Sequence, residues 1–172
     1  MPFFTESLFL LICKMMFFRR KEEKFVSPME GTLIRLEDVP DAVFSEKMMG
    51  DGFAVELTGG CITAPVSGVL ESAFPTGHAF GIRTREGMEV LLHIGLDTVQ
   101  LKGKGFEVQV RQGERITQGA LLAKVDLNYI KSTGKSVISP VIFTSGEQIE
   151  ILKEGAVKNG DAEIVKIQKL EK

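Results

Sequence analysis

From Val26 onward the chain is a succession of short runs of Val, Ile and Leu divided by glycine-containing breaks, and this pattern constrains the fold more than any other feature. Such runs are typical of β-strands joined by turns. We expect helical turns only near residues 41–48 and 127–131, and a last strand over residues 163–170. The 18 glycines and the lack of tryptophan agree with an all-β domain with few helical turns.

Two pairs of similar segments occur within this region. Residues 27–33 (SPMEGTL) resemble residues 64–70 (APVSGVL). Residues 110–122 and 152–164 share two glycines with similar apolar flanks. Paired similarities of this kind predict a domain built from repeated β units.

The bulk properties exclude several classes of protein. A chain of 172 residues is ordinarily one domain, which we expect over residues 26–172. The net charge of -2 and the pI of about 5.8 imply no broad nucleic-acid surface. Cys13 and Cys61 fit no metal-ligand spacing, so we expect a reducing, cytoplasmic environment.

Residues 1–25 precede the predicted domain. Their apolar stretch is interrupted by Lys14 and falls short of the about 20 residues that a spanning helix needs. Glu6 precedes the stretch and Arg19-Arg20-Lys21 follow it, which is the reverse of a signal peptide. Three interpretations remain open: a helix lying on the inner membrane surface, a disordered tail, or a true translation start at Met15 or Met16.

The chain contains only two histidines, His78 and His93. The apolar runs beside them are separated by a turn-like break at residues 85–87, which predicts a β-hairpin. With a two-residue loop at 86–87, Phe80 would lie opposite His93, and His78, Phe80 and His93 would share one face. The histidines would then be diagonal neighbours, roughly 7–8 Å apart at the backbone. A three-residue loop would place them on opposite faces.

A pair of imidazoles on one face suits group transfer. A neutral imidazole is a good nucleophile near pH 7, and a second one can donate a hydrogen bond to the oxygen atoms of the group transferred. The hydroxyl of Thr76 is placed to orient His78. Zinc needs three or four ligands, and only Asp97 or Glu89 would add to two histidines, so we expect no resident metal.

Other catalytic arrangements are not supported by the sequence. No Ser-His-Asp triad can be placed, and no glycine-rich loop opens a helix for nucleotide phosphates. A chain that transfers phosphoryl groups without a nucleotide must receive them from another protein or a small donor. We therefore expect no bound cofactor.

At these residues the sequence resembles a known family, the glucose-type enzyme IIA domain of the bacterial phosphoenolpyruvate-dependent sugar phosphotransferase system (PTS). The family signature is a glycine, two free positions, three apolar residues, a histidine, an apolar residue, a glycine, an apolar residue, a free position, a threonine and an apolar residue. Residues 87–99 (GMEVLLHIGLDTV) satisfy every position. Residues 39–52, 74–80 and 101–106 are also similar to the family.

The resemblance implies an antiparallel β-sandwich or flattened barrel with internal duplication. It also implies that His93 accepts a phosphoryl group from the phosphohistidine of the small carrier HPr and passes it to a cysteine of a sugar-specific IIB domain. His78, with Thr76 as its partner, would stabilise the phosphoryl group. Such transfer needs mainly positioning and charge neutralisation.

The same resemblance implies an apolar docking surface around the histidines. It also implies two acidic residues, Asp41 and Asp97, that would face basic groups on the partners. A contiguous exposed apolar patch marks an interaction site, and methionine suits a surface that meets several partners. The apolar positions are Val43, Phe44, Met48, Met49, Phe74, Phe80, Leu91 and Val99.

Three other functions remain alternatives at this level. The first is a regulatory protein that binds transporters or enzymes through the apolar surface, with phosphorylation as the switch. The second is a biotin- or lipoate-carrying β domain, for which Lys47 lies in an irregular loop rather than at a hairpin tip. The third is a zinc peptidase on a similar duplicated β fold.

Overall fold

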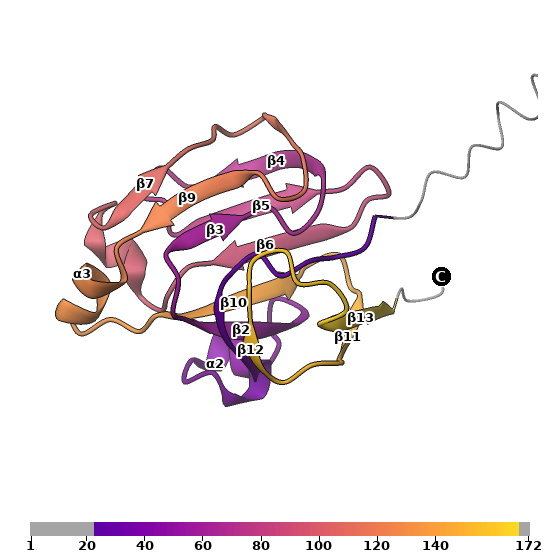
Figure 1. The fold of residues 1–172 in the computed structure, drawn as a ribbon, viewed down its shortest axis with the longest axis horizontal. Coiled ribbons are helices and arrows are strands. Elements are labelled where there is room, and N and C mark those ends of the chain that lie inside the picture. The colour runs from indigo at the N-terminus through magenta and orange to yellow at the C-terminus, as the bar shows by residue number, and fades with distance from the viewer. Residues whose placement is uncertain (1–22, 169–172) are drawn as a thin grey trace, which may run out of the picture.

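The computed structural model describes residues 23–168 and consists mainly of antiparallel strands (Figure 1). The short helices are η1 (Leu36–Asp38), α2 (Ala42–Ser45), η2 (Thr98–Leu101) and α3 (Leu127–Ser132). The strands are β1 (Gly31–Arg35), β2 (Asp51–Leu57), β3 (Cys61–Thr63), β4 (Gly68–Ala73), β5 (Ala79–Arg83), β6 (Glu89–His93), β7 (Phe106–Val108), β8 (Arg115–Ile116), β9 (Leu121–Val125), β10 (Ile138–Phe143), β11 (Gln148–Ile151), β12 (Gly155–Val157) and β13 (Val165–Gln168).

Several predictions from the sequence are confirmed by these elements. The fold is all-β with short helices, and α2 and α3 lie where helical turns were expected. The last strand is β13, although the predicted end of that strand at Leu170 lies outside the described residues. The interpretations of the N-terminal extension likewise concern residues that lie almost wholly outside the described range.

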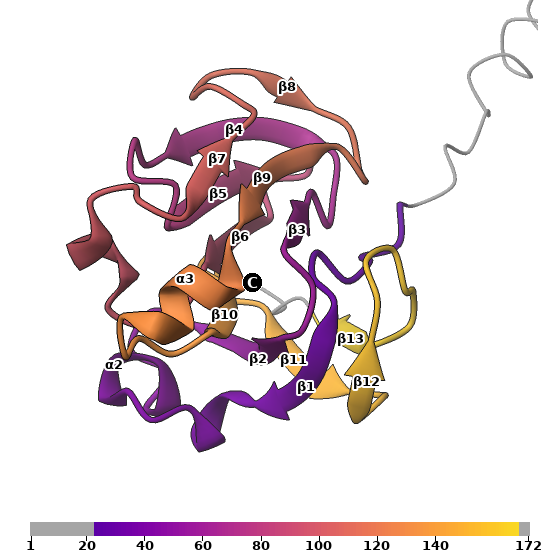
Figure 2. The same cartoon turned by 60° about the vertical axis from the view of Figure 1, so that its left-hand side comes forward.

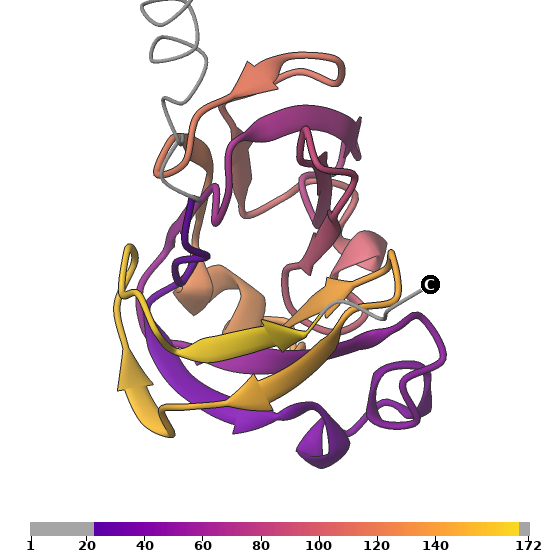
Figure 3. The ribbon, with the colours of Figure 1, turned by 90° about the vertical axis from the view of Figure 1, so that its right-hand side faces the viewer.

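The strand order of the main sheet reveals the duplication. Within residues 23–168 the largest sheet has the order β12-β1-β2-β10-β6-β5-β4-β8. Its two halves, β12-β1-β2-β10 and β8-β4-β5-β6, hold the similar segments at matching places, because residues 27–33 and 64–70 lead into β1 and β4, and residues 110–122 and 152–164 contain β8 and β12. Figures 1 and 3 show the two halves as a lower and an upper layer that wrap around one interior. The predicted internal duplication is therefore confirmed.

Hydrogen bonds between the similar segments repeat in the same way. The Val26 N–H donates to the Pro65 carbonyl at 3.2 Å, and the Thr63 N–H donates to the Pro28 carbonyl at 2.9 Å. Pro28 and Pro65 occupy matching positions in the segments 27–33 and 64–70. Each half thus holds the start of the other, which closes the sandwich at this end.

The main core lies between the two layers. Strand alternation directs Phe53 of β2, Phe80 of β5 and Phe143 of β10 inward, and each of these rings is fully buried. Burial of a side chain of this size contributes about 1.5–3 kcal/mol relative to exposure. This interior fixes the strands whose ends carry the histidines.

A second, smaller apolar cluster lies on the outer face of β2 and β10. Ala54 and Ile142 point outward from these strands, and the connection between β1 and β2, residues 36–50, folds over them. The cluster consists of Leu36, Val39, Phe44, Ala54, Leu96 and Ile142. Figure 2 shows this connection, with α2, at the periphery of the molecule outside β1 and β2.

Two interactions shape the connection over residues 36–50. The Asp41 carboxylate caps α2 by accepting from the Val43 N–H at 2.9 Å. Lys47, with a left-handed φ of 56°, lies 2.7 Å from a carboxylate oxygen of Glu37 and 2.8 Å from one of Asp51. Hydrogen bonds within this cluster raise the pKa of Lys47 and lower that of Glu37. These ion pairs join the connection to the start of β2.

None of the helices among residues 23–168 has the length and apolar character that crossing a membrane requires.

Candidate functional site

His93 lies at the end of β6 with one ring nitrogen held by the backbone. Its Nδ1 is 2.8 Å from the Gly95 carbonyl oxygen. A carbonyl can only accept, so Nδ1 carries the proton and Nε2 of the neutral ring has its lone pair free. The side chain is partly buried, and the Phe44 ring packs against it with centroids 5.1 Å apart. His93 is thus presented as a neutral, oriented nucleophile.

His78 comes to the same place from a tight turn. The Gly77 N–H donates to the Phe74 carbonyl at 2.8 Å, and Gly77 has a φ of 70°. The Thr76 hydroxyl is 2.6 Å from Nδ1 of His78. The rings of His78 and His93 lie edge to face with centroids 5.4 Å apart. The structure therefore brings the three predicted residues together.

The register that led to this prediction was wrong. The observed pairing sets Ala79 opposite His93 and Phe80 opposite Leu92. Thr84 donates its N–H to Met88, which leaves a three-residue loop at residues 85–87. This loop length shifts the ladder by one residue, so Phe80 points into the core on the face away from His93.

The histidines still meet because His78 precedes β5. The Ile94 N–H donates to the His78 carbonyl at 2.7 Å, so the backbone continues the ladder by one step. However, the chain leaves the turn at Gly77 immediately before His78, and the Thr76 hydroxyl holds its ring. Strand alternation therefore does not set the direction of the His78 side chain.

Both histidines are shifted toward the neutral form. Burial lowers the pKa of His78, and the neighbouring His93 lowers it further when charged. Burial also lowers the pKa of His93, although the Gly95 carbonyl and the carboxylates of Asp41 and Asp97 oppose this effect. At pH 7 both rings are therefore largely uncharged, which keeps Nε2 of His93 nucleophilic.

Gly95 is required by the turn that follows His93. It has a φ of 71°, and a Cβ atom there would lie 2.5 Å from Thr98 Cγ2 and 2.6 Å from the Ser136 carbonyl oxygen. Only glycine meets both conditions. The position of the carbonyl that orients His93 therefore depends on this residue.

Five of the apolar side chains predicted for the docking surface are exposed, and we call them the rim. The Phe74 ring lies 5.0 Å from that of His78. The rim residue Val43 lies in α2, which also carries Phe44 against His93. Single exposed apolar side chains are normal, but a contiguous patch of them marks an interaction site. The rim consists of Val43, Met48, Met49, Phe74 and Val99, which are 42–69% exposed.

Three other residues predicted for this surface lie differently. Phe80 is fully buried in the main core, so its prediction as a docking residue was wrong. Phe44 is 5% exposed, because it packs in the outer cluster, and it forms a wall behind His93 rather than part of the rim. Leu91 is partly buried beside the same cluster. Asp41 is partly exposed and Asp97 is exposed.

Within residues 23–168, no three His, Cys, Asp or Glu side chains converge as a metal site would require. Asp97 and Asp41 act on His93 through their charge. The arrangement is one nucleophilic imidazole, a second imidazole beside it, and acidic groups at the edge.

Comparison with known proteins agrees with this geometry. Residues 23–149 match the family model described as phosphoenolpyruvate-dependent sugar phosphotransferase system, EIIA 1. The chain belongs to this family. It is therefore a glucose-type enzyme IIA, a phosphocarrier component of the PTS, as the resemblance in sequence had implied.

Individual relatives of this enzyme IIA are similar over most of its length. The PTS system glucose-specific EIIA component of Mycoplasma capricolum is 50% identical over 148 residues, covering 85% of this chain and 96% of the relative. The corresponding protein of Staphylococcus epidermidis is 44% identical over 150 residues, with 86% and 90% covered. A solved structure, the glucose permease IIA from Mycoplasma capricolum, has a TM-score of 0.79 at 49% identity and covers 86% and 97%.

Some residues of the site were not found from the sequence. Gly95 and Thr98 occupy fixed positions of the family signature, which was the available signal for both. Ser139, whose hydroxyl accepts from the Gly95 N–H at 2.9 Å, follows 44 residues later on β10. No local pattern marks Ser139, because only the folded sheet brings it to the site.

Proposed function

We propose that Nε2 of His93 takes a phosphoryl group from the phosphohistidine of HPr and passes it to a cysteine of a sugar permease IIB domain. In the first step the N–P bond of the donor breaks as a new N–P bond forms at Nε2. In the second step a cysteine thiolate attacks phosphorus and His93 leaves as neutral imidazole. The free lone pair on Nε2, fixed by the bond from Nδ1 to Gly95, carries this proposal.

His78 would stabilise the group being transferred. If the Thr76 hydroxyl donates to Nδ1 of His78, the proton of this ring lies on Nε2 and can be donated to a phosphoryl oxygen. The partly dry surroundings that lower the pKa of both rings also strengthen such a bond. Thr76 would then act by selecting the tautomer of His78.

The rim would receive both partners in turn. Donor and acceptor must each bring phosphorus within bonding distance of His93, so both would cover the same apolar surface. Asp41 and Asp97 would face basic groups on HPr and IIB. Leu91, which is only partly buried and lies two residues before His93, would extend this surface along β6.

The relatives named above are glucose-specific components, and on that basis we propose that the permease served carries glucose. The site of action would be the cytoplasm. A test is growth on glucose of a strain that lacks its own enzyme IIA and expresses this chain. Growth restored on another PTS sugar but not on glucose would overturn the proposed sugar.

A second role is favoured by the exposed apolar side chains predicted to surround His93, one of which, Phe74, packs beside His78. Phosphorylation would add about two negative charges in the middle of an apolar docking surface. Regulatory targets that bind the rim would therefore be released when His93 is phosphorylated. A target that binds equally well to the phosphorylated and unphosphorylated chain would contradict this role.

The relay is tested with labelled phosphoenolpyruvate, enzyme I and HPr. We expect the native chain to gain an acid-labile phosphate and His93→Gln to gain none. His78→Gln should accept the phosphoryl group yet fail to pass it to a IIB domain. Equal labelling of His93→Gln would show that another residue is the acceptor.

A further inference from the structure

Ser139 is a buried polar residue in a strand whose other side chains are apolar. It lies on β10 and is fully buried. Its hydroxyl accepts from the Gly95 N–H at 2.9 Å and donates to the Val137 carbonyl at 3.1 Å. A buried hydroxyl costs free energy unless both its donor and its acceptor are used. Both are used here, and one of them serves the turn after His93.

The Ser139 hydroxyl acts as a hydrogen-bond acceptor just beyond the last paired residues of β6 and β10. The paired residues of β6 and β10 end at Leu92 and Val141. Beyond this pair the chain turns at Gly95, and the backbone there no longer forms the regular ladder. The Ser139 side chain supplies the acceptor that a strand partner would have supplied. It thus allows the turn to form without leaving the Gly95 N–H unpaired.

A continuous set of hydrogen bonds connects this hydroxyl to the reacting ring. Ser139 Oγ holds the Gly95 N–H, and the Gly95 carbonyl accepts from Nδ1 of His93. The Thr98 hydroxyl donates to the Ile94 carbonyl from within the same turn. Both bonds hold the same peptide group, between Ile94 and Gly95, which directly precedes the carbonyl that orients His93: Thr98 binds its carbonyl locally and Ser139 binds its N–H from across the sheet.

We propose that Ser139 is a positioning residue that fixes the tautomer and ring orientation of His93 through Gly95. It does not contact the phosphoryl group. The proposal deepens the relay proposed above and rests on it for its kinetic consequence. Its effect on the unphosphorylated ring is independent of any partner, because the hydrogen bonds lie within this chain.

The decisive variant is Ser139→Ala, which leaves the Gly95 N–H without its acceptor. Ser139→Thr keeps the hydroxyl and should restore the native behaviour. The matched control is Ser27→Ala, since Ser27 is equally buried and its hydroxyl donates to the Met29 carbonyl at 2.8 Å, on a segment that contributes nothing to the histidine site. If Ser139→Ala does not fold, Ser139→Cys, which offers only a weak acceptor, takes its place.

The first measurement is the ¹⁵N spectrum of the imidazole of His93 across pH. We expect the native chain and Ser139→Thr to hold the proton on Nδ1, and Ser139→Ala to show a mixture of tautomers. In single-turnover transfer from phospho-HPr, Ser139→Ala should lose about tenfold in the first-order rate, because a small misplacement of a reacting group is costly. The concentration of phospho-HPr at half-maximal rate should stay within about twofold.

Two results would overturn the proposal. One is a native tautomer and rate in Ser139→Ala. The other is equal loss of rate and of melting temperature in Ser139→Ala and Ser27→Ala, which would mean that any buried hydroxyl matters equally. If the native chain accepted no phosphoryl group at all, the proposed relay would fail, while the tautomer comparison would still decide the role of Ser139.

Discussion

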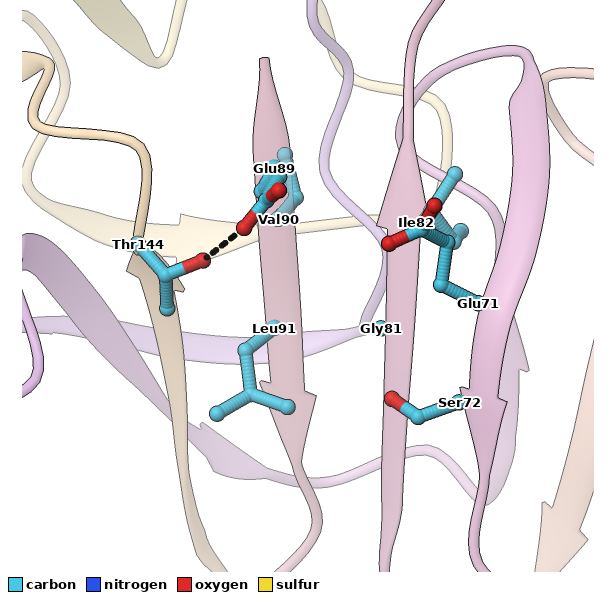
Figure 4. A pocket seen from close by; sticks show the side chains of 8 residues that line it. All are labelled: Glu71, Ser72, Gly81, Ile82, Glu89, Val90, Leu91 and Thr144. Atoms are coloured by element: carbon cyan, nitrogen blue, oxygen red, sulfur yellow. Dashed lines mark hydrogen bonds between the residues drawn. The ribbon is translucent and has the colours of Figure 1, made fainter. Parts of the chain in front are cut away.

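The two halves of the duplicated sheet treat their outer faces differently. In the half formed by β1, β2 and β10, the chain folds its own segment 36–50 over Ala54 and Ile142. In the half formed by β4, β5 and β6, the matching face stays open. Figure 4 shows a pocket on this face, whose lining includes Ser72, Gly81 and Leu91 and where the Thr144 hydroxyl donates to the Glu89 carboxylate at 3.2 Å.

This difference shows how one scaffold yields a site suited to the proposed transfer. The covered half supplies Phe44, which packs against the ring of His93, while the open half leaves Leu91 and His93 partly exposed. His93 ends β6, the strand of the open half that pairs with β10 of the covered half, and His78 lies beside it. A nucleophile that is partly shielded from water, yet accessible to a partner, requires a covered face on one side and an open face on the other.

The largest loss of phosphoryl transfer is expected from a change in the turn after His93. We expect Gly95→Ala to reduce phosphoryl transfer by about 100-fold or more, because the added Cβ clashes with Thr98 and the Ser136 carbonyl and displaces the carbonyl that holds His93. The matched control is Gly87→Ala in the β5–β6 loop, where φ is also positive, at 89°, but nothing lies within 4 Å of the new atom. Transfer rates of the two variants within threefold of each other would contradict the proposed role of the turn.

The β5–β6 hairpin shows how much of this site could be predicted from the sequence. The strands and the three catalytic candidates followed from local pattern and from a signature of residues close together in the chain. The register did not, because the choice of a three-residue loop depends on the left-handed backbone of Gly87. The sequence also did not predict the covering of one outer face or the hydrogen bond to Ser139, because both depend on contacts between distant segments.

Removing the Phe44 ring from the cluster that covers the outer face of β2 and β10 should have the next largest effect. Phe44→Ala should lower the free energy of unfolding by about 3 kcal/mol, because a buried phenyl ring is lost from the outer cluster. It should also raise the pKa of His93 toward its usual value as water reaches the ring. Phe74→Ala is the control, since Phe74 is 44% exposed beside His78. Denaturant unfolding and NMR titration measure both effects, and equal loss of stability in the two variants would refute the distinction between wall and rim.

The pH dependence of stability and of transfer tests how strongly His93 is shielded from water. Because the pKa of His93 is lowered, the unfolded chain binds more protons than the folded one below about pH 6.5. The contribution of His93 to stability is therefore present above that pH and is lost as the pH falls through the folded-state pKa. Transfer should stay constant from pH 8 to below 6.5 and then decline. His93→Gln should lack this part of the stability change, and an unchanged pH profile of unfolding in that variant would disprove the assignment.

The smallest effect on stability is expected at the rim. Met48→Ala should change the free energy of unfolding by less than about 0.5 kcal/mol, because the side chain is 69% exposed. It should nevertheless raise the HPr concentration needed for half-maximal transfer by about threefold. Leu152→Ala is the control, since Leu152 is 51% exposed but lies outside the rim. Titration of transfer rate with phospho-HPr would show whether the two differ.

The strand order of the sheet has a consequence for how the protein is made. Within the sheet described for residues 23–168, β10 lies between β2 and β6, so the β1–β2 hairpin is joined to β4, β5 and β6 in that sheet by a strand from the last third of the chain. Pairings between such distant segments form slowly, and until they form the free strand edges can pair with other chains. Gly95 also lacks its bond to Ser139 until then. During synthesis His93, the proposed phosphoryl acceptor, is therefore among the last parts of the domain to take its final place.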